Sequence, residues 1–305
     1  MQSNIEIPKG RFILPELSKK NKAVLLIILS ALFFTGMNAC VRLSGDLPPV
    51  QKSFFRNFVA AIFAAATLVK THTPVKIPKG CRRAMFLRAF CGTVGILCNF
   101  YAIDKLALAD ASMLNKLSPF FAVIFSIFIL KEKALPKQII AVIIAFAGSL
   151  FIIRPTFSNL ELVPSLIGFL GGVAAGAAYT FVRYMGQRGV KGPIIVFCFS
   201  LFSCAVTLPI MLAGFEPMTA KQLLILLLAG LFAAGGQFAI TGAYSFAPAK
   251  EVSVYDYSQV IFAAIAGFFL FDQIPVPMSI IGYVIIISVA VWTFIQNNKA
   301  KQTKG

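Results

Sequence analysis

Ten long apolar segments, joined by short loops, constrain this chain more than any other feature of its sequence. Crossing the ~30 Å hydrocarbon core of a bilayer takes about 20 helical residues, and the spanning backbone must satisfy its own hydrogen bonds. With 58% hydrophobic and 13% charged residues, the chain has too little polar surface for a water-soluble fold. We therefore predict an all-α integral membrane protein with ten transmembrane helices. They are expected at residues 23–42, 50–69, 84–103, 110–130, 136–153, 163–183, 193–212, 220–245, 251–271 and 275–296.

Lysine and arginine residues are distributed very unevenly over the loops between these segments. Twenty lie in the two tails and in the alternate loops that share one side of the membrane, whereas four lie on the other side. Because loops rich in Lys and Arg stay in the cytoplasm, both tails, residues 1–22 and 297–305, are expected there. The net charge of +17 follows from this asymmetry. The basic residues form no patch, so nucleic acid is excluded as a partner.

Motifs for catalysis, metal binding and nucleotide hydrolysis are missing from the sequence. The six cysteines include no C-x-x-C pair, and the one histidine, His72, stands alone, so neither a metal site nor a cofactor is expected. The sequence also has no G-x-x-x-x-G-K-[ST] motif and no recognisable arrangement of nucleophile and base. We expect neither an enzyme nor an ATP-driven pump.

The two halves of the chain align without a gap at an offset of 141 residues. One ungapped offset that holds from the first to the last segment of each half indicates duplication. Since each half has five segments, the second copy enters the membrane from the opposite face. We predict two inverted five-helix repeats, residues 23–153 and 163–296. The matches are Val41-Arg42 with Val182-Arg183, Gly95 with Gly236, Ser112 with Ser253, Phe121-Ala122 with Phe262-Ala263, Pro136 with Pro277 and Ile139-Ile140 with Ile280-Ile281.

Short polar and aromatic motifs punctuate both halves. They are Phe55-Arg56-Asn57-Phe58, Asn99-Phe100-Tyr101-Ala102-Ile103, Ala109-Asp110-Ala111-Ser112, Leu117-Ser118-Pro119-Phe120, Leu130-Lys131-Glu132-Lys133, Tyr255-Asp256-Tyr257 and Phe271-Asp272-Gln273. In these motifs the chain resembles the EamA group of the drug/metabolite transporter superfamily, over nearly its whole length. The resemblance implies ten helices in two inverted five-helix repeats. It also implies transport of small metabolites across a cell inner (plasma) membrane.

Four basic residues fall inside the predicted spans, where an ionised side chain is costly. Lys52 and Arg88 lie near span ends, so their long side chains are expected to reach the membrane surface. Arg56 and Lys116 each lie about 9 Å inside a span and are expected to bind substrate. The alternative for both is a structural hydrogen bond to helix-end carbonyls or to a neighbouring asparagine.

Lys116 has the most informative position of the four. Pro119 follows it closely and is expected to free a backbone carbonyl and bend the span. In the repeat, Asn115 and Lys116 are matched by Asp256 and Tyr257, which places two inverted polar spots towards one axis. Asp256 is read as the only carboxylate well inside a span and is expected to be the coupling or proton site, since apolar surroundings favour the neutral acid. The alternatives are a fixed ion pair with a nearby basic group and a contact to a substrate cation.

Amide and aromatic side chains complete the candidate substrate site. The cavity walls are expected to come chiefly from spans one, three, four, six, eight and nine. These side chains also satisfy one another in helical bundles, so each has a structural alternative. The full set of candidates is Asn38, Arg56, Asn99, Tyr101, Asn115, Lys116, Tyr179, Gln237, Tyr255, Asp256, Tyr257 and Gln259.

Together these features predict a secondary transporter for a small polar organic metabolite that works by alternating access. The basic residues favour a substrate with a carboxylate or phosphate, such as an amino acid, a nucleoside-like cofactor or a vitamin. The alternative is a lipid flippase or a polyspecific drug exporter of the same fold, with a cavity open to lipid and fewer buried charges. Substrate and membrane lipid are the expected partners, and the sequence leaves a homodimer open.

Overall fold

The computed structural model describes residues 19–131, 136–153, 161–246 and 253–302, and every regular element in these residues is a helix. The all-α prediction is therefore confirmed for the described part of the chain. The elements are α1 (Lys19–Leu43), α2 (Pro49–Lys70), the 3₁₀ turn η1 (Lys79–Cys81), α3 (Arg82–Lys105), α4 (Leu108–Asn115), α5 (Ser118–Ile129), α6 (Pro136–Ile153), α7 (Leu162–Gly186), α8 (Gly192–Ala213), α9 (Ala220–Phe246), the 3₁₀ turn η2 (Ser253–Tyr257), α11 (Ser258–Phe271) and α12 (Pro277–Gln302).

Seven helical segments within the described residues are long and apolar enough to cross a membrane. They belong to α1, α2, η1 with α3, α4 with α5, α7, α8 and α9, and shorter apolar stretches lie in α6, η2 with α11, and α12. Large apolar side chains cover the outside of the molecule; Phe128 is 73% exposed and Phe269 76% exposed. Such a surface is suited to lipid and not to water, so this is an integral membrane protein.

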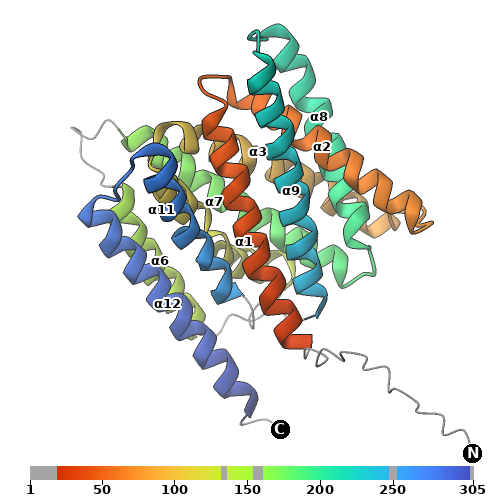
Figure 1. The fold of residues 1–305 in the computed structure, drawn as a ribbon. Helices are drawn as coiled ribbons and strands as arrows, with labels where there is room; N and C mark the ends of the chain where they lie inside the picture. The colour runs from red at the N-terminus through yellow and green to blue at the C-terminus, as the bar shows by residue number, and fades with distance from the viewer. Residues whose placement is uncertain (1–18, 132–135, 154–160, 247–252, 303–305) are drawn as a thin grey trace, which may run out of the picture.

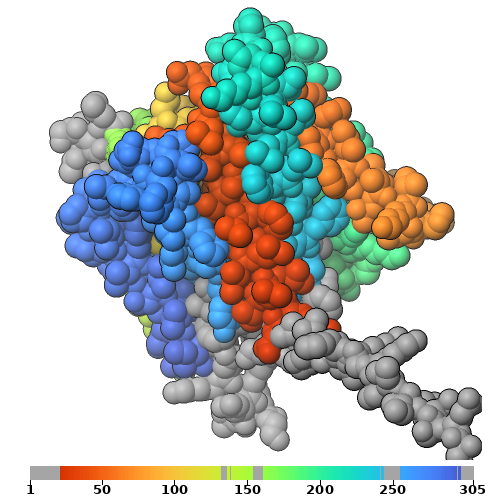
Figure 2. Space-filling view, viewed as in Figure 1, coloured from red at the N-terminus to blue at the C-terminus, as the bar shows by residue number. Residues whose placement is uncertain are grey.

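Helices from opposite halves of the chain pack side by side. α1 runs along α9 and α3 along α7, while α2 packs on α8 and α6 on α12. In Figure 1, α1 and α9 cross the middle of the molecule, with α6, α11 and α12 to one side and α2 and α8 to the other. Figure 2 shows that side chains fill the spaces between the helices on this face. Both halves therefore contribute to one main hydrophobic core.

The fourth predicted span is two helices and not the single helix that the sequence led us to expect. Lys116 and Leu117 interrupt it between α4 and α5. Pro119 accounts for this break, because a proline has no N–H to donate to the carbonyl of Asn115. The ninth predicted span likewise opens with the turn η2 before α11 begins. Its first two residues, 251–252, lie outside the described residues.

The break between α4 and α5 is held by the backbone of α7. A Cβ atom placed on Gly176 would lie 2.8 Å from the carbonyl oxygen of Ser118, and one on Gly172 would collide with the carbonyl of Leu114. Only glycine allows the backbones to approach so closely. The interruption is therefore a packed and fixed feature of the fold.

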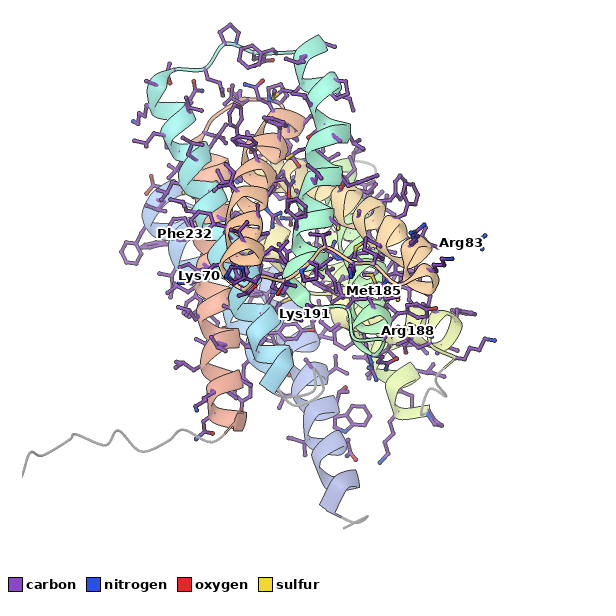
Figure 3. The ribbon with its side chains drawn as sticks, turned by 90° about the vertical axis from the view of Figure 1, so that its right-hand side faces the viewer. Lys70, Arg83, Met185, Arg188, Lys191 and Phe232 are labelled. Atoms are coloured by element: carbon purple, nitrogen blue, oxygen red, sulfur yellow. The ribbon has the colours of Figure 1, made fainter. Side chains whose placement is uncertain are left out.

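The α2–α3 and α7–α8 connections lie together over a second, smaller hydrophobic cluster that includes Met185. Lys191 donates a hydrogen bond of 3.4 Å to the α2–α3 connection. Figure 3 shows Lys70, Arg83, Arg188 and Lys191 gathered around this cluster. The ends of α2 and α7 thus share one side of the molecule, together with basic residues from two predicted cytoplasmic loops.

Candidate functional site

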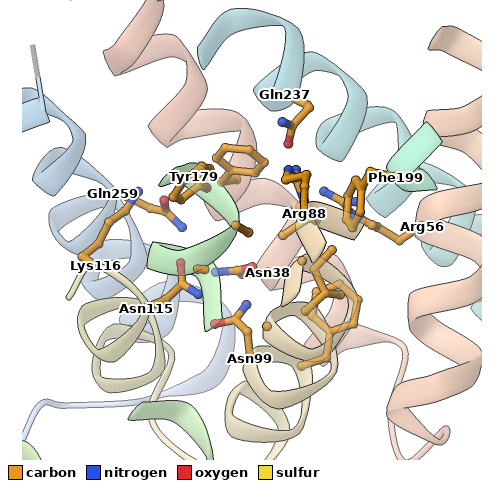
Figure 4. A pocket seen from close by; sticks show the side chains of 18 residues that line it. Asn38, Arg56, Arg88, Asn99, Asn115, Lys116, Tyr179, Phe199, Gln237 and Gln259 are labelled. Carbon is orange, nitrogen blue, oxygen red and sulfur yellow. The ribbon is translucent and has the colours of Figure 1, made fainter. Parts of the chain in front are cut away.

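A polar cavity of about 90 Å³ lies where eight helical segments meet. Its volume is below the ~300–1,000 Å³ of most small-molecule sites, so it fits a charged head group better than a whole metabolite. α2 and α8 contribute to its walls in addition to the six spans expected from the sequence. Figure 4 shows the lining side chains. They belong to Phe34, Met37, Asn38, Arg56, Arg88, Gly92, Gly95, Ile96, Asn99, Phe100, Asn115, Lys116, Ala175, Ala178, Tyr179, Phe199, Gln237 and Gln259.

One end of the cavity carries two arginines beside an aromatic ring (Figure 4). The guanidinium carbons of Arg88 and Arg56 lie 4.2 Å and 5.8 Å from the ring centroid of Phe199, within cation–π range. Arg56 also donates to the Asn57 side chain at 2.6 Å, and Asn57 donates to Ser203 on α8 at 2.9 Å. Both arginines are buried, and neither forms an ion pair with any described residue.

The other end of the cavity carries a buried ion pair. Nζ of Lys116, in the α4–α5 break, lies 2.6 Å from Oδ2 of Asp256 in η2, and the two residues are 5% and 6% exposed. The Tyr257 hydroxyl donates to the Lys116 carbonyl at 3.0 Å, which occupies an oxygen that the break leaves without a helical N–H. An ion pair with a nearby basic group is one of the alternatives that the sequence analysis gave for Asp256.

Amide side chains line the space between the two ends. Asn38 Nδ2 donates to Ser112 at 3.4 Å, while its buried Oδ1 accepts no hydrogen bond from the described residues. Asn99 and Gln259 are also buried, at 8% and 5% exposure. A buried amide oxygen without a hydrogen-bond partner lowers the stability of the folded protein. A ligand that places a hydrogen-bond donor in the cavity would supply the partner that Asn38 Oδ1 needs.

Eight of the twelve residues predicted from the sequence line this cavity: Asn38, Arg56, Asn99, Asn115, Lys116, Tyr179, Gln237 and Gln259. Asp256 and Tyr257 lie behind its wall and contact it through Lys116.

Tyr101 and Tyr255 do not line the cavity, which corrects the prediction for both. Two residues along a helix is a rotation of about 200°, so Tyr101 faces away from the cavity that Asn99 enters. Tyr255 packs against the main hydrophobic core.

Ten lining residues were not among the sequence candidates, and Arg88 and Phe199 are the two of them that shape the charged end of the cavity. Arg88 was expected to reach the membrane surface, but it is 3% exposed and points into the cavity. The signal was available, because Arg88, Gly92, Gly95 and Asn99 follow one another at helical spacing and so share one face of α3. Phe199 had no comparable signal among the 31 phenylalanines of the chain.

Lys52 also corrects a prediction. Its side chain is fully buried and does not reach the membrane surface, because Nζ lies 2.7 Å from both carboxylate oxygens of Asp104 on α3.

Asp110 is a second buried carboxylate, at 3% exposure, where the sequence drew attention to Asp256 alone. The hydroxyl of Tyr283 donates to it at 2.5 Å. This contact ties α4 to α12 away from the cavity.

A multi-pass helical protein with a polar cavity between the two halves of its chain has the architecture of a membrane transporter. The chain belongs to the EamA-like transporter family, whose profile matches residues 21–154 and 163–295. The resemblance inferred from the motifs is therefore confirmed, and the protein is a membrane transporter of the drug/metabolite transporter superfamily.

The chain is 30% identical over 267 residues to the pseudopaline exporter CntI of Pseudomonas aeruginosa (strain UCBPP-PA14), covering 87% of this chain and 93% of that protein. It is 28% identical over 282 residues to human solute carrier family 35 member G1, covering 86% of this chain and 76% of that protein. A solved crystal structure matches with a TM-score of 0.65 at 15% identity, covering 91% of this chain and 98% of the other. That last likeness concerns the fold alone.

Proposed function

We propose that this protein is a secondary transporter that moves a small polar organic metabolite by alternating access, driven by a gradient or by exchange. The observation that carries the proposal is the cavity. Charged and amide side chains from both halves of the chain converge on it, beside the interruptions at α4–α5 and η2–α11. Secondary transporters bind their substrates at such discontinuous helices, where two repeats meet.

Ten spans in two inverted repeats, residues 23–153 and 163–296, explain how the helices pair. At the offset of 141 residues, α1 corresponds to α7 and α9 to α3, so the α1–α9 and α7–α3 contacts are equivalent. α2–α8 and α6–α12 each pair a helix with its own counterpart. Lys131 and Asp272 are also counterparts, and both have a left-handed backbone, with φ of 54° and 51°, at the ends of α5 and α11. This agreement supports the inverted duplication.

The lining of the cavity favours a substrate that carries a carboxylate or phosphate. Arg56 and Lys116 supply positive charge, Tyr179 and Phe199 supply aromatic faces, and the amides supply donors and acceptors. Amino acids, nucleoside-like cofactors and vitamins share these features. A cavity of about 90 Å³ has to widen to admit such a molecule, as alternating access requires.

Lys116 and Asp256 form the proposed coupling pair. The carboxylate holds Lys116 Nζ at 2.6 Å, so a proton on Asp256 would weaken the pair and release the ammonium to a substrate anion. Tyr179 and Tyr257 are ionisable side chains that interact with Asp256. In this scheme the proton binds Asp256 and the substrate anion binds Lys116, so both replace the ion pair at one buried site.

The proposal also covers location, orientation and direction. We place the protein in a cell inner membrane with both tails in the cytoplasm, and we take export as the direction of net transport. The twenty basic residues on one side support the orientation, and the relative named as an exporter supports the direction. A reporter fused after Lys299 should be cytoplasmic, and one inserted at Asn159 should be external. An external reporter after Lys299 would contradict the orientation.

A lipid flippase or polyspecific exporter receives less support from this cavity. Such proteins need a site suited to apolar or varied ligands, whereas two buried arginines and a buried ion pair border this one. Charged groups of this kind favour a narrow class of charged substrates.

Counterflow in proteoliposomes tests the proposal. Vesicles preloaded with one member of a panel of amino acids, nucleotides or vitamins are assayed for uptake of its radiolabelled form. The test variant is Asn99→Ala, on the cavity face of α3, and the matched control is Tyr101→Phe, on the opposite face of the same helix. We expect uptake to fall at least tenfold in the first and to persist in the second. Equal uptake in both variants, or no counterflow of any panel member, would contradict the proposal.

A further inference from the structure

Two positive charges at one end of the cavity have no counter-charge in the described part of the chain. Arg56 comes from α2 and Arg88 from α3, and they are 4% and 3% exposed. Among the described residues, the Arg56 side chain has one hydrogen-bond partner, Asn57, and the Arg88 side chain has none. The Nε atoms of both are buried and find no partner in the same residues. An isolated buried charge is strongly unfavourable, so an arrangement of two needs a reason.

The buried and half-buried carboxylates of the described helices already have partners elsewhere. Asp104 pairs with Lys52, Asp256 pairs with Lys116, and Asp110 accepts from Tyr283. The Lys116–Asp256 pair is neutral as a unit. The described walls of the cavity therefore carry about two uncompensated positive charges, both at the arginine end.

The surroundings hold these guanidiniums in place instead of letting them reach a water boundary. Both lie within cation–π range of the Phe199 ring, and Asn57 holds Arg56 and also donates to Ser203. Arg88 folds back over Gly92, where an added Cβ would collide with its guanidinium and lie 2.8 Å from the Phe199 ring. Gly92 thus provides the space that aims Arg88 at the cavity.

We infer that Arg56 and Arg88 form one binding site for a doubly charged oxyanion group. The site takes a phosphate-type group or a pair of carboxylates, with Arg88 as a binding residue and Gly92 as a positioning residue. Guanidinium groups suit oxyanions because their N–H donors form paired hydrogen bonds with two oxygens. The inference rests on the proposed function and narrows its substrate class from any carboxylate or phosphate to a group with two negative charges.

The size of the cavity agrees with this assignment. About 90 Å³ accommodates an oxyanion group but not the body of a metabolite. The charged group of the substrate would occupy the arginine end, and the rest of the molecule would extend towards the amides and Lys116 when the cavity widens. Figure 4 shows the two ends separated in this way.

Thermal unfolding of the purified protein in dodecyl maltoside tests the inference. The probes are sodium phosphate, sodium sulfate and sodium succinate, each compared with sodium chloride and sodium acetate at equal ionic strength. Because a ligand that binds only the folded state stabilises it by mass action, we expect a saturable rise in melting temperature with the dianions alone. A rise with phosphate and sulfate but not succinate assigns a phosphate-type group, and the reverse assigns a dicarboxylate.

Variants locate the site. Arg56→Gln and Arg88→Gln should each raise, at least tenfold, the dianion concentration that gives half of the full rise in melting temperature. Lys137→Gln, on the exposed surface, should leave this concentration unchanged. If either arginine variant fails to fold, Gly92→Ala keeps both charges, displaces Arg88 and should also weaken the effect. No dianion effect in the wild-type protein, or an undiminished effect in the arginine variants and Gly92→Ala, would overturn the inference.

The same preparations separate this inference from the proposed function. Dianion binding without counterflow of any panel metabolite would contradict the transport proposal and leave the anion site standing. Counterflow that is insensitive to Arg56→Gln and Arg88→Gln would overturn the anion site and leave transport standing.

Discussion

The two ends of the cavity differ in how their buried charges are partnered. At one end Lys116 is neutralised by Asp256 at 2.6 Å, and a tyrosine hydroxyl occupies the neighbouring free carbonyl. At the other end Arg56 and Arg88 share a phenylalanine ring and no described carboxylate. Both ends are equally buried, so burial does not explain the difference.

The difference teaches that a buried charge paired within the protein and one without a described counter-charge can be told apart by their partners. A buried ion pair holds two interrupted helices together, and removing one member leaves a charge stranded. Arg56 and Arg88 are already buried without a described counter-charge, and a bound anion would supply one. Substitutions at the two ends should therefore have opposite signatures in stability and in ligand response.

The largest loss of stability is expected from Asp256→Asn. It leaves the Lys116 ammonium buried and unpaired, which costs roughly 3–5 kcal/mol. The double variant Lys116→Met/Asp256→Asn should recover much of that loss, because no charge is stranded. Thermal unfolding of the wild type, Asp256→Asn, Lys116→Met and the double variant measures the coupling. An Asp256→Asn variant as stable as the wild type would contradict the role of the pair.

The same Asp256→Asn protein also tests coupling to protons. If Asp256 carries the coupled proton, the amide removes the pH dependence of net transport and leaves substrate–substrate exchange active. A large loss of stability with an unchanged pH profile would show a purely structural pair.

A smaller loss is expected from Asp104→Asn at the edge of the bundle. Lys52 is fully buried but the Asp104 side chain is 17% exposed, so water relieves part of the stranded charge. We expect about 1–2 kcal/mol, between surface and buried pairs. Counterflow should persist at the wild-type rate in this variant, and its loss would place the pair in the transport machinery.

The arginine end should show the reverse sign. Arg88→Gln removes an uncompensated charge, so the melting temperature without ligand should stay constant or rise slightly, while the response to dianions is lost. Arg88→Lys, which keeps the charge but not the forked geometry, should retain a weakened response. A marked loss of stability in ligand-free Arg88→Gln would mean that the arginine is structural.

The smallest effect is expected from Lys137→Gln, whose ammonium donates to Gln296 at 2.9 Å on the exposed surface. An exposed contact of this kind contributes less than about 1 kcal/mol. Unfolding and counterflow should both match the wild type, which makes this variant the baseline for the other three. A clear change in either property would show that non-specific effects of charge removal are large.

Much of the fold was predictable because the signals are local. Apolar length predicted the helical segments to within a few residues, and Pro119 predicted that the span beginning with α4 would be distorted. The complete break at Lys116 was not predictable, because it also depends on the backbone of α7 reaching the interruption through Gly172 and Gly176.

The site was predictable where the repeat or a buried charge singled out a residue. Lys116, Asp256 and Tyr257 lie together as the offset of 141 residues suggested, although only Lys116 faces the cavity. Arg88 was assigned to the membrane surface from its closeness to the end of a span. That position along the helix does not reveal which neighbours surround the side chain. Lys52 was misassigned for the same reason, since its partner Asp104 comes from another helix.

Crystals of the protein soaked in selenate would test the central claim most directly, because anomalous scattering locates this dianion without reference to any assay. The account predicts one buried selenate within hydrogen-bond distance of both Arg56 and Arg88, beside the ring of Phe199. It also predicts that the Lys116–Asp256 pair stays intact in the same crystal. Selenate bound at Lys116 and not at the arginines, or absent from the cavity while both arginines keep their positions, would contradict it.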